Sequence, residues 1–565
     1  MRRGGMTWTA LFVLMVAASA RGQVATVDLP PAELAPGLTP EELASRVERF
    51  APVELAFDAS LLDAHDRVVV KKLVEASDVL NEIFRLQVWR KNLDYRAELA
   101  DAQGPGLDVA TEYYDIMAGP WDRVEDDEPF LDVGPKPAGA GYYPEDASKE
   151  EIEAWLQSHP QDREAFASYY TVIERRGDDL VAVPYREVYQ DRLARVSALL
   201  AEAAEHAANP SLKDFLAKRA DSFVSDDYLA SEIAWMQLSD NLIEPTIGPY
   251  EVYEDAFMGW KAAYESFIAI KDPGASEDLE VLVEHLRDLE AALPMDDAYK
   301  SLDRSFESPL SVADAIYTAG DARRGIMTLA YNLPNDPRVS EEYGTKKVML
   351  RNVIDAKFEK VLVPIAERIM EPSLAAEIEP RSFTTFIVMH ELAHGLGPRV
   401  VQGTEESVSV RLAASYSPIE EAKADVVGVL SLAQLADDGV YTQEFKRQVY
   451  ISSVAGLFRC VRFGTSDAHG KGCAVQLNHL LDAGAISVGQ DGRFGIDFER
   501  IHDGYESLAR DLLTIEATGD VAGAEALLAA QGDLPATATM AIGRLADVPV
   551  DIRPVYPVVE AMRDW

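Results

Sequence analysis

The apolar residues of this chain recur at spacings of three and four, a pattern typical of helices that bury one face, and they rarely alternate in twos. Val188 to Ala207 and Ser276 to Leu293 show it most clearly, and Pro294 should end the second helix. Short candidate strands are few: Arg67 to Val70, Leu180 to Pro184 and Val548 to Val558. We therefore expect a mainly α protein with a minor β element, an α+β fold.

One long stretch interrupts the helical pattern. Val124 to Pro144 is rich in acidic residues, glycine and proline, which favour turns. Just after it, Ser148 and Glu151 have the spacing of a capping box, in which each side chain can bond the backbone of the other. The sequence thus predicts irregular structure followed by a new helix.

Length and charge limit the function. With 565 residues, 48% of them hydrophobic, the chain can bury a large core, in three or four domains or in two large lobes. It carries 53 basic against 96 acidic residues, a net charge of −43. Nucleic acids and anionic lipids require a cationic face, so neither is an expected partner.

The first 22 residues have the features of a signal peptide. Arg2 and Arg3 precede an apolar run from Thr9 to Val16, and small residues follow at Ala18 to Ala20. The run is shorter than the ~20 apolar residues of a membrane span. We expect a periplasmic or extracellular protein with no membrane span after signal cleavage. In such a compartment the two cysteines, Cys460 and Cys473, can form a disulfide, although two buried thiols fit almost as well.

The pentapeptide from His390 to His394 is an HExxH motif at the end of an apolar segment. Residues four apart share one face of a helix, so both imidazoles can bind one metal ion with Glu391 beside it. A protein of this composition contains such a motif by chance roughly once in a hundred cases. A second signal is therefore needed.

That signal is an acidic helical segment 30 residues downstream. Glu421 can supply the third ligand of a catalytic zinc site, and Glu420 is the alternative ligand. Asp425, one turn further, can hold a zinc-bound imidazole in place. By itself the segment would be interpreted as a solvated helix start, but beside HExxH we favour ligands. Paired imidazoles prefer zinc to calcium and also accept Co or Mn.

A three-ligand zinc site implies hydrolysis. Bound zinc lowers the pKa of its water toward ~7, so that Glu391 can accept the proton as general base and later donate it to the leaving amine. Peptides are the usual substrates of this chemistry. The oxyanion that forms needs a further donor, such as a Tyr or His.

These motifs resemble those of the peptidase family of dipeptidyl peptidase III, especially its shorter-motif relatives, among them plant proteins in which a peptidase-like region is fused to a Nudix domain. HELAHGLGP is similar to the family's zinc helix, and EEAKAD to its second zinc motif, whose second glutamate binds the metal. The resemblance thus supports His390, His394 and Glu421 as ligands of one Zn²⁺. It extends over roughly Tyr250 to Leu480.

Three further blocks carry the resemblance and imply substrate contacts. Glu251 and Tyr253 stand at the family's E-x-Y unit, for the substrate amine and the oxyanion; Asn332 and Asn335 stand in its N-x-P-N segment; His469 stands in its A-H motif. These residues also fit roles away from any substrate. The first pair can belong to an acidic surface helix, the asparagines can simply form a turn, and His469 can be a chance loop residue or the ligand of a second metal.

The resemblance implies two lobes around a wide cleft: residues 23–330 form a mixed, substrate-binding lobe with a β core, and residues 331–565 a mainly helical zinc lobe. The last ~30 residues are candidates for a return to the first lobe. The chain departs from dipeptidyl peptidase III in its shorter HExxH and in Cys473, where the family has an arginine.

The function we expect is an exported zinc metallopeptidase that releases dipeptides from peptide N-termini. The first alternative is an inactive protein that binds zinc or peptides, against which the intact Glu391 argues. The second alternative is a zinc hydrolase of other specificity, an aminopeptidase or an amidase.

Overall fold

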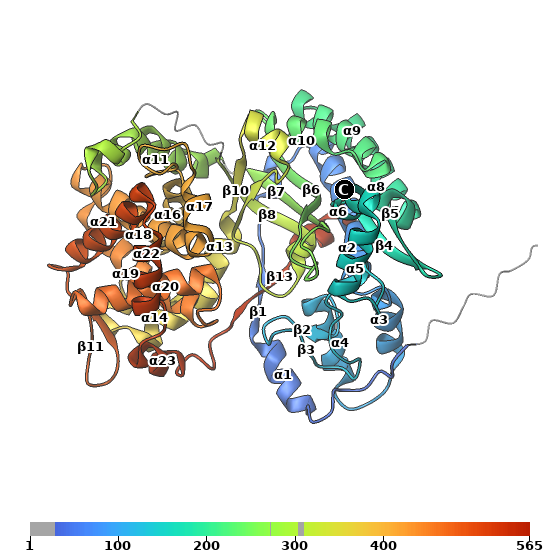
Figure 1. The fold of residues 1–565 in the computed structure, drawn as a ribbon, viewed down its shortest axis with the longest axis horizontal. Helices are drawn as coiled ribbons and strands as arrows, with labels where there is room; N and C mark the ends of the chain where they lie inside the picture. Colours follow the sequence, from blue (N-terminus) through green and yellow to red (C-terminus); the bar gives the residue numbers. More distant parts are fainter. Residues whose placement is uncertain (1–28, 272, 303–309) are drawn as a thin grey trace, which may run out of the picture.

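The computed structural model describes residues 29–271, 273–302 and 310–565, which form two lobes (Figure 1). Residues 1–22, for which the sequence predicts a signal peptide, lie outside the described residues. Within the described ranges, no helix combines the length and the apolar character needed to cross a bilayer. The fold is mainly helical with a smaller β part, as the sequence predicts.

A five-stranded sheet forms the centre of the first lobe. Its strands follow the order β6-β7-β8-β10-β9, and all neighbours are antiparallel except β8 and β10. The short strand β9 therefore lies at one edge of the sheet. The strands are β6 (Ile243–Glu251), β7 (Ala263–Lys271), β8 (Leu310–Gly320), β9 (Ala330–Leu333) and β10 (Lys346–Leu350).

Most of this sheet escapes sequence analysis because β6, β7 and β8 are buried on both faces. A strand with two buried faces shows no alternation of apolar and polar residues. Helix α2 (Ala64–Val88) packs against β7 and β8, and α8 (Gln190–His206) packs against α2. Helix α2 thus covers the central strands β7 and β8, and α8 lies against α2.

The expected strand from Arg67 to Val70 is wrong, since these residues lie in the first turns of α2. The three valines favour a strand locally, but Asp63 and Asp66 form a capping box just before them. Their burial then continues at helical spacing through Leu73. Capping and packing outweigh β propensity here.

The other predicted elements are confirmed. Val188 to Ala207 contains α8, and Ser276 to Leu293 matches α11 (Pro273–Ala292). Ser148 caps α5 (Lys149–Ser158) by accepting the Glu151 N–H at 3.2 Å, and residues 124–144 form turns with little regular structure. Leu180 to Pro184 falls within β5 (Asp179–Pro184), which pairs with β4 (Thr171–Arg176). Val548 to Val558 contains β13 (Asp551–Val555) but is too long, because α24 (Pro557–Ala561) begins before its end.

The second lobe is a bundle of helices around one apolar cluster. Helix α18 lies at its centre and contacts α16, α19, α20 and α21. The long helices are α16 (Pro380–Ala393), α18 (Tyr416–Asp437), α19 (Gln443–Val461), α20 (Ala468–Asp482) and α21 (Ile501–Thr518). Further helices of the two lobes include α1 (Pro40–Glu48), α3 (Asn92–Asp101), α4 (Leu107–Met117), α9 (Pro210–Ser225), α10 (Leu229–Met236), α14 (Val363–Ile369), α22 (Val521–Gln531) and α23 (Ala536–Ile542).

The chain passes between the lobes more than once. Helix α11 packs in the apolar cluster of the helical lobe, whereas β8, β9 and β10, which follow it, belong to the sheet. At the end of the chain, β13 pairs in parallel with β1 (Phe50–Glu54). These contacts show that segments of both lobes alternate along the chain. The division at residues 330 and 331 stays a prediction.

Cys460 and Cys473 form a disulfide between α19 and α20, with their Cα atoms 6.5 Å apart. The sequence leaves open whether these cysteines pair. The bond closes a loop with a sequence separation of 13 residues. It therefore fixes the start of α20 to a helix of the lobe core.

The double variant Cys460→Ser/Cys473→Ser should lose about 3 kcal/mol of unfolding free energy, because the unfolded chain regains the freedom of this loop. Urea unfolding of the oxidised protein and the variant measures the difference. Wild-type protein with its disulfide reduced is the control, and its unfolding free energy should fall by the same amount. A variant as stable as the oxidised wild type would contradict this prediction.

Candidate metal centre

Two helices bring three candidate metal ligands together. His390 lies in the last turn of α16, His394 caps the C-terminal end of this helix, and Glu421 faces both from α18. The Oε2 atom of Glu421 lies 3.5 Å from Nε2 of His390 and 3.8 Å from Nε2 of His394. One ligand atom from each of the three residues lies within 4.8 Å of the others. The structure thus groups the residues that the sequence predicts as ligands.

Each imidazole is oriented by a carboxylate on the far side of its ring. Nδ1 of His390 lies 2.7 Å from Oδ1 of Asp425, and Nδ1 of His394 lies 2.8 Å from Oε1 of Glu420. A carboxylate at Nδ1 fixes the ring and places the proton there. Both Nε2 atoms are therefore directed toward Glu421.

These contacts fit a zinc ion. The Oε2 atom of Glu421 is buried and accepts no hydrogen bond within the described part of the chain. Nitrogen and oxygen ligands of tetrahedral zinc, with bonds of ~2.0–2.1 Å, stand about 3.3 Å apart, close to the spacings of this oxygen and the imidazole nitrogens. Two imidazoles and one carboxylate are also a catalytic donor set, because a fourth position stays open.

Glu420, the alternative ligand, has another task here. Besides His394, its Oε1 accepts a hydrogen bond at 2.8 Å from Nζ of Lys423, which also donates to the carbonyls of Ala393 and Leu396 at 3.1 Å. Lys423 is buried, so this contact ties the end of α16 to α18. Glu420 thus orients His394, whereas Glu421 faces both imidazoles.

Two glycines allow the helices to approach closely enough for these contacts. A Cβ at Gly428 of α18 would lie 3.3 Å from the backbone N of His390. A Cβ at Gly472 of α20 would lie 3.1 Å from both the N of Ala422 and the carbonyl O of Pro418. Both distances are tighter than ordinary carbon contacts. Helix α18 is thus packed tightly between α16 and α20 at the level of the ligands.

Charged neighbours within the centre determine the pKa values of His390 and Glu420. Burial lowers the pKa of His390, but the carboxylates, Asp425 above all, outweigh burial and raise this pKa to about 9 in the metal-free chain. Burial raises the pKa of Glu420, but Lys423 and His394 outweigh it and hold this pKa well below its usual range. The carboxyl that orients His394 therefore stays ionised at neutral pH.

Glu391 points from α16 toward the sheet lobe, where Lys347 of β10 contacts it. Nζ of Lys347 donates to the carboxylate Oε2 at 3.1 Å and also to the backbone carbonyl of Glu391. Burial raises the pKa of Glu391, but Lys347 and the two histidines outweigh burial and lower it. Glu391 is thus ionised at neutral pH, the state that a general base requires.

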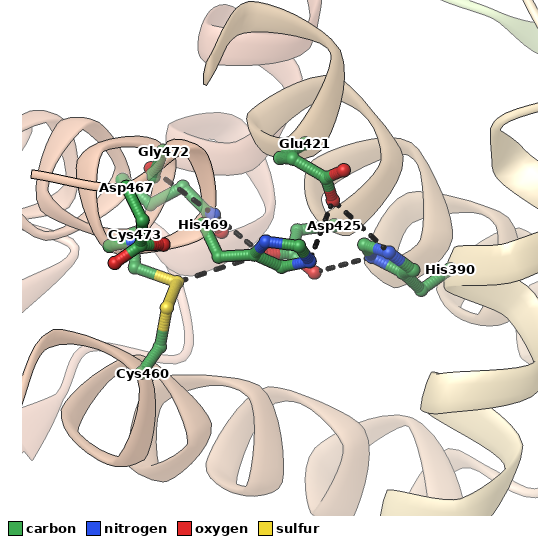
Figure 2. The surroundings of a disulfide bond; sticks show 10 residues. His390, Glu421, Asp425, Cys460, Asp467, His469, Gly472 and Cys473 are labelled. Atoms are coloured by element: carbon green, nitrogen blue, oxygen red, sulfur yellow. Dashed lines mark hydrogen bonds and ion pairs between the residues drawn. A yellow bond between two sulfur atoms is a disulfide. The ribbon is translucent and has the colours of Figure 1, made fainter. Parts of the chain in front are cut away.

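His469 of α20 lies beside Glu421 (Figure 2). Its Nε2 is 3.3 Å from Oε2 of Glu421, and 68% of its side chain is exposed. Cys473 follows on the same helix, and its Sγ lies 4.0 Å from Oδ2 of Asp425, which also accepts a hydrogen bond from Nε2 of Gln476 at 2.8 Å. The structure thus brings His469 to the metal ligands, and its role toward substrate stays a prediction.

The predicted substrate residues lie on the sheet lobe. Nδ2 of Asn335 lies 3.4 Å from Oε1 of Glu251 and donates to the carbonyl of Tyr250 at 3.2 Å, so two of these residues are neighbours. Burial raises the pKa of Glu251. Asn332 lies exposed on β9, and Tyr253 is 76% exposed in a turn after β6. Glu251 ends strand β6 and Tyr253 lies in the turn after it, so this pair does not belong to a surface helix, which was the alternative expected from the sequence.

Sequence analysis misses three contributors to the centre: Lys347, Lys423 and Gln476. Lys423 follows Glu420 by three residues, the spacing of a helical ion pair, which is a usable signal. Lys347 and Gln476 reach the site from distant segments. No local pattern in the sequence marks them.

Comparison with known proteins agrees with the geometry. The model for peptidase family M49 matches residues 147–427. Nudix hydrolase 3 of Arabidopsis thaliana is 35% identical over 577 residues, which cover 92% of this chain and 74% of that protein. The chain belongs to peptidase family M49.

Solved structures of M49 members share the whole fold. Dipeptidyl peptidase III of Caldithrix abyssi superposes with a TM-score of 0.89 at 44% identity, over 91% of this chain and 99% of that one. Dipeptidyl peptidase III of Corallococcus sp. strain EGB superposes with a TM-score of 0.79 at 39% identity, over 95% of this chain and 99% of that one. The predicted resemblance and the two-lobe fold are confirmed. This M49 chain is a metallopeptidase of a zinc-dependent family, and peptides are its class of substrate.

Gly472→Ala should weaken zinc binding by the M49 chain, because the new methyl group meets backbone atoms that cannot rotate away. The cost of such overpacking is about 1–3 kcal/mol, and the backbone that it displaces, at Pro418 and Ala422 of α18, flanks the candidate ligand Glu421. Zinc affinity, measured by chelator competition, checks it. Gly456→Ala on α19 is the control, since a Cβ there meets nothing within 4 Å. Equal affinities of the two variants would contradict the prediction.

Zinc binding should release about one proton from His390 at pH 7, because this imidazole is protonated in the metal-free chain up to about pH 9 and must lose that proton to bind. Zinc affinity should accordingly rise by about tenfold per pH unit below pH 9. Titration calorimetry in buffers of different ionisation enthalpy counts the protons.

Asp425→Asn provides the control for this measurement. The variant lacks the carboxylate that raises the pKa of His390 most, so its affinity should level off at a lower pH. An affinity of the wild type that does not change between pH 6 and pH 8 would exclude a protonated ligand.

Proposed function

We propose that the chain is an exported, zinc-dependent metallopeptidase that releases dipeptides from the N-termini of peptides, with Glu391 as general base. The observation that carries the proposal is the convergence of two carboxylate-oriented Nε2 atoms on Oε2 of Glu421, which accepts no hydrogen bond within the described part of the chain. Zinc at this position supplies a Lewis acid and an acidified water.

The residues of the chain then have distinct tasks. The carboxylate of Glu391, ionised at neutral pH, accepts the proton of the attacking water and transfers it to the leaving amine. His469 stands exposed beside Glu421, where it can contact a bound peptide. Tyr253 is our candidate for the donor to the oxyanion.

The sheet lobe supports the choice of an N-terminal substrate. Glu251 and Asn335 are neighbours, so that a carboxylate and an amide oxygen can together receive a peptide ammonium. Strand β9, which carries Asn332, lies at the edge of the sheet, where backbone groups are available to an extended peptide. An ammonium held at a fixed distance from the metal determines which bond is cut.

Export and substrate charge belong to the proposal as well. The apolar run between Thr9 and Val16 behind two arginines supports signal cleavage and a periplasmic or extracellular location. The net charge of −43 would attract peptides with positive termini or side chains.

Hydrolysis assays with dipeptidyl and aminoacyl naphthylamides, with and without chelator, test this function. We expect turnover of the dipeptidyl compounds only, lost with chelator and restored by zinc. Release of single amino acids would instead support an aminopeptidase. Absence of turnover of either substrate by the zinc-loaded enzyme would support a protein that only binds.

Glu391→Ala should keep its zinc and lose about 10²–10⁴-fold in kcat, because it removes only the base. His390→Ala should lose both zinc and activity. Glu405→Ala is the control, since this glutamate is exposed and lies outside the centre. Metal analysis combined with kinetics checks all three, and full activity of Glu391→Ala would reject the mechanism.

A further inference from the structure

The two lobes meet at one lysine beside the candidate base. Lys347 lies in β10 of the sheet lobe, and its Nζ contacts both the carboxylate and the backbone carbonyl of Glu391 on α16. The two side chains are 12% and 22% exposed. An ion pair shielded to this degree is held more firmly than one on an open surface.

The contact also completes the end of α16. The last carbonyls of a helix lack partners within it. Gly395, four residues after Glu391, donates its N–H to the carbonyl of Leu392 instead. Lys347 donates to the carbonyl of Glu391, so it holds the backbone and the carboxylate of one residue at the same time.

The neighbouring lysine shows that this orientation is specific. Side chains alternate across a strand, and Lys346 points to the opposite face, where its Nζ lies 2.6 Å from Oε1 of the buried Glu244. Lys346 thus anchors β10 within the sheet lobe. Lys347 is thereby presented to the helical lobe by a fixed strand.

Strand β10 also connects Lys347 to the predicted substrate side. Lys347 is the direct partner of Asn332 in the antiparallel pair of β10 and β9. A peptide that pairs with the free edge of β9 would therefore lie one strand away from β10, which carries Lys347. The paired strands β9 and β10 would thus hold the peptide and, through Lys347, the Glu391 carboxylate.

We propose that Lys347 is a positioning residue: it sets the direction of the Glu391 carboxylate from the sheet lobe, and so places the base relative to a peptide on β9. This inference rests on the proposed function of Glu391. Among the described residues of the centre, Nζ of Lys347 contacts Glu391 and none of the three candidate metal ligands, so it acts on the reaction through the base. Its removal should therefore change the rate of the chemical step and leave metal binding intact.

Lys347→Met tests the inference, because it keeps the length and apolar stem of the side chain and removes the ammonium. We expect kcat to fall about 10–100-fold, as for a misplaced base, with KM within about threefold of the wild type. Zinc content and the unfolding midpoint should stay unchanged. Lys347→Arg, which can still donate to the carboxylate, should recover most of the rate.

Lys360→Met is the matched control, since it removes a lysine that pairs with Glu359 on the surface; its kinetics should equal those of the wild type. A Lys347→Met enzyme with unchanged kcat overturns the inference. So does a changed KM at constant kcat, which would indicate a substrate contact. Loss of zinc, or no recovery in Lys347→Arg, would indicate a structural role and equally overturn it.

A second measurement does not depend on turnover. Crystal structures of the zinc-loaded wild type and of Lys347→Met, or of Lys347→Gln if that variant folds poorly, should show the carboxylate of Glu391 displaced while His390, His394 and Glu421 stay in place. An unmoved carboxylate overturns the inference. If the wild type cleaves none of the peptides, the proposed function fails, and this comparison still decides the role of Lys347.

Discussion

The metal centre depends on the hydrogen bonds that fix its two imidazoles. Asp425 and Glu420 occupy the Nδ1 atoms, so both Nε2 atoms are directed toward Glu421. These two carboxylates and the candidate ligand Glu421 all lie on α18, whereas the histidines lie in the last turn and at the C-cap of α16. Every feature of the centre therefore depends on how closely and in which register these two helices pack, and Gly428 sets that closeness.

The two lobes supply different parts of the candidate site. The helical lobe supplies a rigid, deeply packed site, with α18 held between α16 and α20. The sheet lobe supplies the edge strand and the residues expected to hold a peptide. Because Glu391, the proposed base, lies at the border between them, its environment is composed of side chains from both lobes. A site of this kind is complete only when the lobes are correctly placed relative to each other.

How far the sequence predicts this structure varies with the range of the interaction. Ligand spacings on α16 and α18 are local, so HExxH and the acidic pair indicate them directly, as Ser148 indicates the start of α5. The sheet is missed because β6 to β8 are buried on both faces and show no alternation. Lys347 is missed because its partner is 44 residues away, in another lobe, and Arg67 to Val70 mislead because tertiary packing outweighs local propensity.

The parallel pairing of β1 with β13 bears on the order of folding. It joins Phe50 to Asp551, close to opposite ends of the described chain, and closure of so long a loop is entropically costly and slow. The intervening helical bundle has its own apolar cluster and can assemble before this pair forms. During synthesis, the ribosome must therefore release β13 before the first lobe can be sealed, and chaperones that keep β1 unpaired until then would favour the native product.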